Sequence, residues 1–275
     1  MKVKIPTVSA LVLAMTLPLA AEAHRGWLLP AATVLSGEEP WVTVDGAISN
    51  DIFHTDHAAM RLDGLKVVGP DGEEVEIQNG HTGKYRSTFD LQLTEQGTYR
   101  VFNASGGLNA RWVTDEGERR FWPGRGETPA PGDFEKKVPK DAKELTVTQS
   151  SRRIETFITA GVPTDEVLAP TNQGLELVPV THPNDLFAEE EATFRLLIDG
   201  EAAVGAKVTV LAGGMRYRNS QDAIEVETDD EGTFSVTWPD AGMYWLSASY
   251  RDDKATAPAT ARQGSYVATL EVLPQ

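Results

Sequence analysis

The sequence predicts an all-β protein: two immunoglobulin-like β-sandwich domains that follow a cleaved signal peptide. Short runs that alternate apolar with polar residues are typical of antiparallel strands, and no segment carries a sustained 3.6-residue apolar stripe. Glycine and proline account for 24 and 16 of the 275 residues, which favours turns over long helices. With 40% hydrophobic residues, the chain can bury the cores of two domains of about 120 residues each.

Residues 1–23 are predicted to be a signal peptide. Two lysines lie within Met1–Lys4, an uncharged stretch follows from Ile5 to Ala21, and Ala21-Glu22-Ala23 has the small-x-small pattern that signal peptidase cleaves. An uncleaved anchor is the alternative, but it needs roughly 20 apolar residues, and this stretch is shorter and interrupted by prolines. We therefore expect a periplasmic protein with no membrane span in the mature chain, which would begin at His24.

The remaining chain is predicted to form two strand-rich domains. The first spans residues 24–172 and the second residues 173–275, with the boundary near Pro170–Gly174. Predicted strands in the first domain include Trp41–Val44, Leu65–Val68 and Glu74–Ile77. A segment rich in proline and glycine, residues 123–139, is expected to be an excursion from this domain.

One pattern occurs in both domains at identical spacing. Two predicted strands are joined by a turn that ends in Gly-x-Tyr, in the sets Phe89, Gly97, Tyr99 and Phe234, Gly242, Tyr244. A tyrosine at this place is common in immunoglobulin-like sandwiches, where its hydroxyl group fixes a corner of the fold. The repeated pattern therefore supports two sandwich domains of the same type.

Charge and cysteine content exclude several classes of function. The chain has 25 basic and 41 acidic residues, a formal net charge of −16, which would repel the phosphate backbone of a nucleic acid. It has no cysteine, so thiolate metal sites and cysteine nucleophiles are excluded. Motifs of serine hydrolases and zinc proteases are absent, and Tyr85 follows Gly83-Lys84 where a phosphate-binding loop needs serine or threonine. We therefore assign no catalytic residue and do not expect an enzyme.

The predicted cleavage would place a strong chelating group at the start of the mature chain. His24 would then offer both an α-amine and an imidazole, whose reference pKa values are about 7.7–8.0 and 6.5. A borderline transition metal can displace the protons of both groups and bind them in one chelate ring. With one or two further histidines, the site would suit copper, nickel, cobalt or zinc.

His54 and His57 are the candidates for those further ligands. Histidines three residues apart share a face only on a helical turn or in a loop, so this pair requires such a conformation. Asp56, between them, could bind the metal or hold a ligand imidazole through its second ring nitrogen. The alternative is a solvated loop that contains two unrelated histidines.

The other two histidines have different surroundings. His182 lies between Pro179 and Pro183, where the backbone is restricted, and it is either a fourth ligand or a residue of a rigid linker. His81, in the sequence Gly80-His81-Thr82-Gly83, is predicted to lie at the tip of a surface turn. The candidate metal ligands are therefore His24, His54, His57 and His182.

Several strings of the sequence resemble the DUF4198 family. The first is His24-Arg25-Gly26-Trp27-Leu28-Leu29-Pro30, directly after the predicted signal peptide, and the second runs from Leu175 to Leu186 and includes Thr181-His182-Pro183-Asn184-Asp185. The segments Phe194–Gly200 and Gly205–Val210 are similar as well. The resemblance covers essentially the whole mature chain. It implies a periplasmic protein with immunoglobulin-like domains and a link to nickel or cobalt uptake, and it adds support to His24 and His182.

Three functional hypotheses follow. The first is a periplasmic transition-metal-binding protein that captures or hands over a divalent ion, nickel or cobalt by preference, with a metal transporter or an outer-membrane receptor as its partner. The second is a copper oxidoreductase that uses the same amine and imidazole groups. The third is an envelope interaction module without metal, in which the two domains bind another protein.

Overall fold

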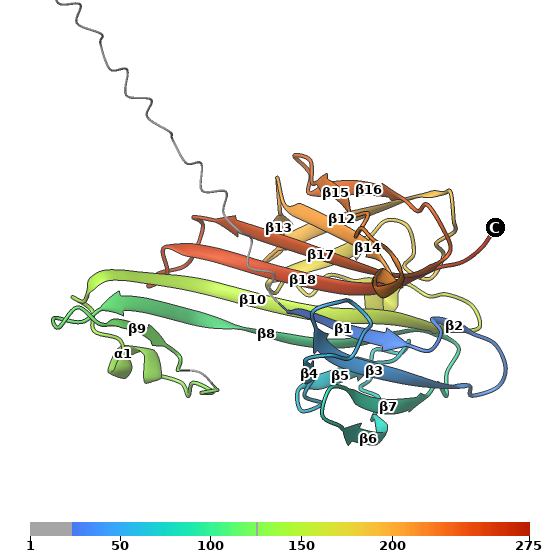
Figure 1. Ribbon diagram of the computed structural model, residues 1–275, viewed down its shortest axis with the longest axis horizontal. Helices are drawn as coiled ribbons and strands as arrows, with labels where there is room; N and C mark the ends of the chain where they lie inside the picture. The colour runs from blue at the N-terminus through green and yellow to red at the C-terminus, as the bar shows by residue number, and fades with distance from the viewer. Residues whose placement is uncertain (1–23, 125) are drawn as a thin grey trace, which may run out of the picture.

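The computed structural model describes residues 24–124 and 126–275, so the predicted signal peptide lies outside the described residues. Three sheets form two sandwiches (Figure 1). The first sheet covers one face of the N-terminal sandwich and has the order β1-β3-β7-β6, with β4 paired to β3. Its strands are β1 (Arg25–Pro30), β3 (Trp41–Ser49), β4 (Ala58–Ala59), β6 (Gln78–Thr82) and β7 (Ser87–Gln92).

The second sheet, which we call the central sheet, belongs to both sandwiches. Its order is β15-β14-β17-β18-β10-β8-β5, with β2 paired to β10 and β9 paired to β8. Its strands are β2 (Val34–Leu35), β5 (Leu65–Val68), β8 (Gly97–Val113), β9 (Arg119–Trp122), β10 (Lys143–Ala160), β14 (Lys207–Ala212), β15 (Ile224–Glu227), β17 (Gly242–Asp252) and β18 (Ala261–Val272).

The third sheet closes the C-terminal sandwich, in which β12 pairs with β11, β13 and β16. Its strands are β11 (Leu175–Pro179), β12 (Glu191–Ile198), β13 (Glu201–Ala202) and β16 (Thr233–Thr237), and the short helices of the described chain are α1 (Asp133–Lys137), η1 (Glu166–Leu168) and η2 (Met215–Tyr217). No helix within the described ranges is long and apolar enough to cross a membrane.

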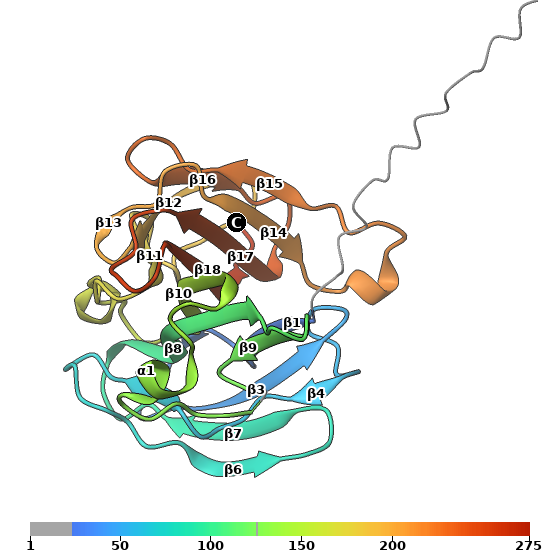
Figure 2. The same ribbon diagram turned by 90° about the vertical axis from the view of Figure 1, so that its left-hand side faces the viewer.

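The two sandwiches are joined through one parallel strand pair. β10 lies beside β18 from Thr148 opposite Ala261 to Thr156 opposite Thr269. Figure 2 shows the sheets of the N-terminal sandwich below this junction and those of the C-terminal sandwich above it. The prediction of two β-sandwiches is therefore confirmed, and the structure adds that they share a continuous sheet.

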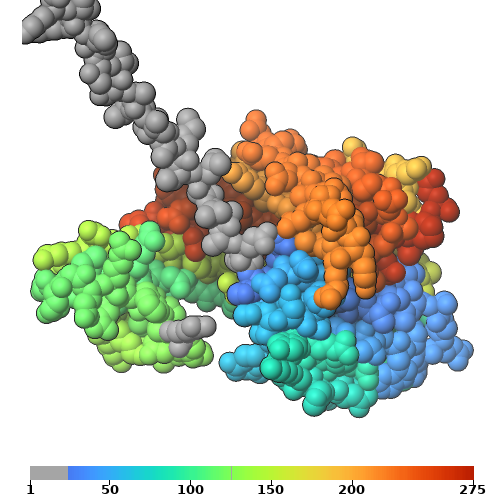
Figure 3. Space-filling model, viewed as in Figure 1, coloured from blue at the N-terminus to red at the C-terminus, as the bar shows by residue number. Residues whose placement is uncertain are grey.

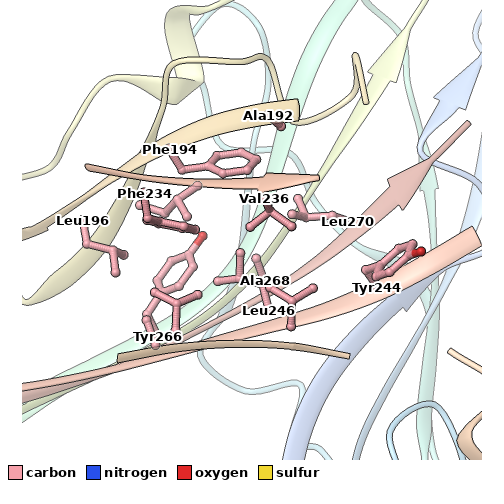
Figure 4. Packing of buried hydrophobic residues seen from close by; sticks show 14 of the residues in the cluster. Ala192, Phe194, Leu196, Phe234, Val236, Tyr244, Leu246, Tyr266, Ala268 and Leu270 are labelled. Atoms are coloured by element: carbon pink, nitrogen blue, oxygen red, sulfur yellow. The ribbon is translucent and has the colours of Figure 1, made fainter. Parts of the chain in front are cut away.

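Aromatic and aliphatic side chains from both faces fill the C-terminal core (Figure 4). Phe194 and Phe234 come from the third sheet, with ring centroids 5.6 Å apart, and they face Leu246 and Leu270 of the central sheet. All four side chains are buried. The alternation of apolar and polar residues along each strand thus places its apolar set on the inner face.

Both predicted tyrosine corners are present. The Tyr99 hydroxyl group donates to the Glu95 carbonyl oxygen at 3.0 Å and accepts the Glu95 backbone N–H at 2.8 Å. In the second sandwich, the Tyr244 hydroxyl group makes the same pair of bonds with Asp240, at 2.7 and 3.2 Å. The equal spacing in the sequence therefore reflects one local structure used twice.

Two local predictions were wrong. Glu74–Ile77 does not form a strand, because only Glu74 makes a bridge, to Val68, and the strand beside β7 is β6. The alternation in this segment arises because Val75 and Ile77 pack against the core without joining a ladder. His81 lies within β6, opposite Thr88, and not at the tip of a turn, although its side chain is exposed as expected for a surface residue.

Long strands extend the central sheet beyond both sandwiches. The segment from Ala104 to Val147, which we call the arm, contains the outer parts of β8 and β10 together with β9 and α1 (Figure 1). The predicted excursion at residues 123–139 lies in this arm. A small apolar cluster stabilises it and includes Trp122, Val138 and Ala259.

A network of charged side chains is buried where η1 and the start of β11 meet the central sheet. The Arg100 Nε atom donates to Glu155 at 2.9 Å, and the Tyr266 hydroxyl group donates to the other carboxylate oxygen at 2.6 Å. Arg153 lies 3.6 Å from Glu155 and 3.8 Å from Glu176. Burial opposes the charge of Arg100, but Glu155 raises the pKa of Arg100 overall. Burial, and then the charge of Glu155, raise the pKa of Tyr266 well above its ordinary value.

Gly264 of β18 permits the close approach of the third sheet. A Cβ atom at this position would overlap Leu175 Cβ and lie 3.1 Å from Ser151 Oγ. We expect Gly264→Ala to lower the free energy of unfolding by about 1–3 kcal/mol, measured by urea denaturation, because the added methyl group must displace β11. Ser265→Ala adds no atom on the same strand and should change stability by less than about 0.5 kcal/mol. Equal stability of the two variants would contradict this account.

Candidate metal centre

Trp27 anchors the first strand where the two sandwiches meet. Its ring is buried and its Nε1 atom donates to Ser49 Oγ at 2.7 Å, which fixes the start of the loop that follows β3. Trp245 of β17 donates from its Nε1 atom to the Gly26 carbonyl oxygen at 3.0 Å. The chain around His24 is therefore held against the C-terminal sandwich by its neighbours.

The loop from Asn50 to His57 is fixed from below by apolar residues. Ile52 is buried, and the Phe53 ring packs edge-on against Trp27 with centroids 5.7 Å apart. Phe53 has a φ of 58°, so the chain reverses sharply just before His54. The spacing of His54 and His57 predicted a helical turn or a loop, and the structure has a loop here.

Asp56 holds the same loop together. Its Oδ1 atom accepts the Asn50 backbone N–H at 2.9 Å. Burial works against ionisation, but the hydrogen bonds from Asn50 and the nearby His54 together lower the pKa of Asp56. The carboxylate therefore braces the loop and adds a negative charge beside the histidines.

The structure brings His24 and His57 together. Their rings are stacked with centroids 3.6 Å apart and planes 10° from parallel. Both residues are exposed, so solvent and ions can reach them. The contact joins the residue before β1 to the last residue before β4, two points that are far apart in the sequence.

His54 lies in the same loop but is engaged with a cation. The Arg216 Nη1 atom of η2 lies 2.6 Å from His54 Nε2, so the guanidinium donates and this ring nitrogen accepts. A metal bound through Nε2 would require Arg216 to move away. Sequence reasoning did not identify Arg216, because nothing local to the loop indicates a residue of the C-terminal sandwich.

His182 is not brought together with the other three histidines. Its Nδ1 atom accepts the Asn184 backbone N–H at 3.1 Å, which places the ring proton on Nε2, 3.1 Å from Thr98 Oγ1 and 3.3 Å from the Thr164 carbonyl oxygen. Both ring nitrogens therefore have partners within the fold: Nδ1 bonds within its own loop after β11, and Nε2 lies beside the start of β8 and the segment beyond the end of β10.

The position of β1 explains this separation. A Cβ atom on Gly26 would meet Ile154 of β10, whereas Thr98 bonds to Thr159 on that strand. Five residues of an extended strand span about 16 Å. His182 thus belongs to a polar network at the C-terminal end of β10, whereas β1, which follows His24, packs against the middle of that strand.

The described side chains alone do not form a complete metal cage. Among residues 24–124 and 126–275, no three histidine, cysteine, aspartate or glutamate side chains are close enough together to hold an ion. The two stacked imidazoles offer two nitrogen donors once one ring tilts, because their lone pairs lie in nearly parallel ring planes, and a chain that begins at His24 would add its amine as a third. The donor set fits a borderline divalent ion only with that amine or with a rearranged His54.

Comparisons with known proteins identify a family. The family model described as "Domain of unknown function (DUF4198)" matches residues 21–252. No curated protein matches the sequence.

Similar solved structures include the D0-D1 domain of intimin, with 10% identity over 90% of this chain and 97% of that chain and a TM-score of 0.23. The human OSCAR ligand-binding domain has 12% identity over 91% and 100% of the two chains, with a TM-score of 0.20. Likenesses at these scores carry no argument about function. The family match covers most of the sequence, so the chain belongs to the DUF4198 family.

Proposed function

We propose that this protein is a secreted transition-metal-binding protein, whose mature chain begins at His24 and takes up or delivers a divalent ion. The ion is bound by the His24 amine and ring and by the His57 ring. Nickel and cobalt are the favoured ions, and copper and zinc suit the same nitrogen donors.

The contact between His24 and His57 carries the proposal. The sequence has five histidines, and two that are distant in the chain stack at 3.6 Å on an exposed surface. An apolar anchor under each of them holds this arrangement: Trp27 follows His24, and Phe53 precedes the histidine loop. Histidines on a rigid support lose less entropy when they bind an ion than histidines on a mobile tail.

His54 has a supporting role in this proposal. In the described state it accepts a hydrogen bond from Arg216, and the positive guanidinium opposes the approach of a second cation. With an ion at His24 and His57, Arg216 would either keep its hydrogen bond to His54 or leave and release His54 as a fourth donor. A change at Arg216 would therefore alter the affinity without removing a donor atom.

The charge of the whole chain supports capture of a cation. A formal net charge of −16 raises the local concentration of divalent ions near the surface, an effect that weakens as salt is added. We propose a periplasmic location and transfer of the ion to a metal transporter or an outer-membrane receptor. These assignments rest on the signal-like residues 1–23 and on the resemblance described above.

Titration of the mature chain with Ni²⁺ tests the proposal. We expect His57→Ala to weaken binding about 10–100-fold in calorimetry, because it removes an imidazole donor next to His24. His81→Ala removes an exposed histidine of β6 and should leave the affinity within about twofold, as expected for a residue outside the site. Cu²⁺ and Zn²⁺ titrations of the same proteins give the order of preference.

The outcomes separate the three hypotheses. Equal affinities for the two variants would overturn the proposed site. Absence of bound metal and of any binding would favour an interaction module. Tight Cu²⁺ binding with reductant-dependent oxygen consumption would favour an oxidoreductase.

A further inference from the structure

A cleft of 1190 Å³ lies on the central sheet beside the arm. β8, β10, β14, β17 and β18 form its floor, and Trp122, Pro123 and Glu127 line it from the segment at and after β9. Figure 3 shows the molecule hollowed between the arm, drawn in green, and the N-terminal sandwich, drawn in blue and cyan. The volume exceeds that of many pockets for single small molecules, which leaves room for an extended ligand.

One row of polar residues crosses the floor from strand to strand. Lys207 pairs with Ser249, Ser249 with Ser265, Ser265 with Arg152, and Arg152 with Ser105. Residues directly opposite each other in paired strands project from the same face of a sheet, so these five side chains lie side by side. Lys207 and Arg152 are separated by three strand spacings, about 14 Å.

A second row runs next to the first and is linked by hydrogen bonds. The Arg251 Nη1 atom donates to Gln263 Oε1 at 3.1 Å, and Gln263 Nε2 donates to Ser150 Oγ at 3.2 Å. Gly107 stands opposite Ser150 and leaves open space above the sheet. The floor therefore presents the hydroxyl groups of short serine side chains, together with the amide and guanidinium groups of side chains that are hydrogen-bonded to one another.

The cleft is basic in an acidic protein. Arg152, Lys207 and Arg251 are exposed, and within the part of the chain that the structure describes none of them forms an ion pair with a carboxylate. Glu127 is the one acidic residue among the described lining residues. Two carboxylates border these three cations, Glu127 and, opposite Lys207 on β15, Glu227, so the cations outnumber the carboxylates here although the chain has 41 acidic and 25 basic residues. Such a cleft attracts an anion that the rest of the surface repels.

We propose that this cleft binds an anionic, hydroxyl-rich oligosaccharide that carries carboxylate or sulfate groups. The cations on the floor bind groups spaced along the oligomer, and the serine and glutamine side chains bind its hydroxyl groups. An acidic peptide fits less well, because the backbone groups of the floor strands are already paired within the sheet and cannot add a peptide strand. Neither the cations nor the cleft involves the histidines, so this site is independent of metal binding.

Calorimetry at low salt with a hexamer of galacturonate tests the proposal, using the chain that begins at His24. We expect the double variant Arg152→Ser and Lys207→Ser to weaken binding at least about tenfold, because it removes two charges from one row. The matched control is Lys66→Ser with Lys84→Ser, which changes the net charge equally at exposed positions outside the cleft. The control should stay within about twofold, and both variants should keep their melting temperature because the replaced residues are exposed.

Other ligands in the same assay decide between the classes. A heparin-derived hexasaccharide shows whether sulfate can replace carboxylate, and its binding with the same dependence on Arg152 and Lys207 would also support the proposal. Neutral maltohexaose should not bind. Equal binding of the double variant and the control, tighter binding of hexaglutamate than of hexagalacturonate, or no binding of either acidic oligosaccharide would overturn the proposal.

Discussion

Glu155→Gln is expected to lower the free energy of unfolding by about 3–5 kcal/mol. The Glu155 carboxylate is fully buried and receives hydrogen bonds from Arg100 and Tyr266, while Arg153 lies 3.6 Å away. A neutral amide of the same size leaves two buried guanidinium groups with Glu176 as their one remaining buried carboxylate. Urea denaturation followed by tryptophan fluorescence measures the loss.

A paired variant distinguishes charge imbalance from loss of packing. Replacing Glu155 and Arg100 together by leucine restores equal numbers of buried positive and negative groups, so this double variant should be more stable than Glu155→Gln. Glu225→Gln, on exposed β15, should change stability by less than about 0.5 kcal/mol. If Glu155→Gln unfolded at the same urea concentration as the parent protein, the buried charge network would not stabilise the fold as described.

A chain that carries one additional glycine before His24 is expected to bind Ni²⁺ about 100-fold more weakly, or worse. The extension keeps the His24 ring beside His57 but converts the His24 α-amine into an amide, a poor donor at neutral pH, and moves the free amine one residue away, out of the chelate ring of His24. The ring and the amine of one residue bind as a chelate, so loss of one donor also removes the benefit of linking them. Calorimetry on the extended and mature chains measures the difference.

Two comparisons make this test specific to the amine. The extended chain should have the melting temperature of the mature chain, since His24 is exposed and its addition lies outside the described strands. A chain that starts at Arg25 loses the ring as well and should bind more weakly still. Equal affinity of the extended and mature chains would show that the amine is not a ligand.

Features set by neighbouring residues could be predicted from the sequence. The tyrosine corners depend on a fixed spacing from a turn to Tyr99 or Tyr244, and each hydroxyl group bonds only four residues back. The loop that the spacing of His54 and His57 predicted is likewise present, with its turn at Ile52 and Phe53. Alternation failed at Glu74–Ile77, because apolar side chains can reach a core from a segment that makes only an isolated bridge, from Glu74 to Val68, and no extended ladder.

Features that join distant parts of the chain could not be predicted. Arg100, Glu155 and Glu176 resemble ordinary strand or surface charges until the fold places them in one interior. The contact of Arg216 with His54, and the row from Lys207 to Ser105, depend on strand order in the central sheet, which periodicity does not encode. For His182 the sequence left two alternatives, a fourth ligand or a residue of a rigid linker, and its hydrogen bonds to Thr98 and Asn184, which tie its loop to β8, appear only in the fold.

The parallel pairing of β10 and β18 also limits how this molecule can be divided. The central sheet continues from one sandwich into the other through this strand pair. Separating the sandwiches would therefore expose unpaired amide and carbonyl groups along both β10 and β18. The connection between the two sandwiches is therefore rigid, because neither sandwich can rotate against the other without breaking the backbone hydrogen bonds between β10 and β18. An ion held at one end of the chain and a sugar held beside the arm would consequently keep a constant mutual orientation.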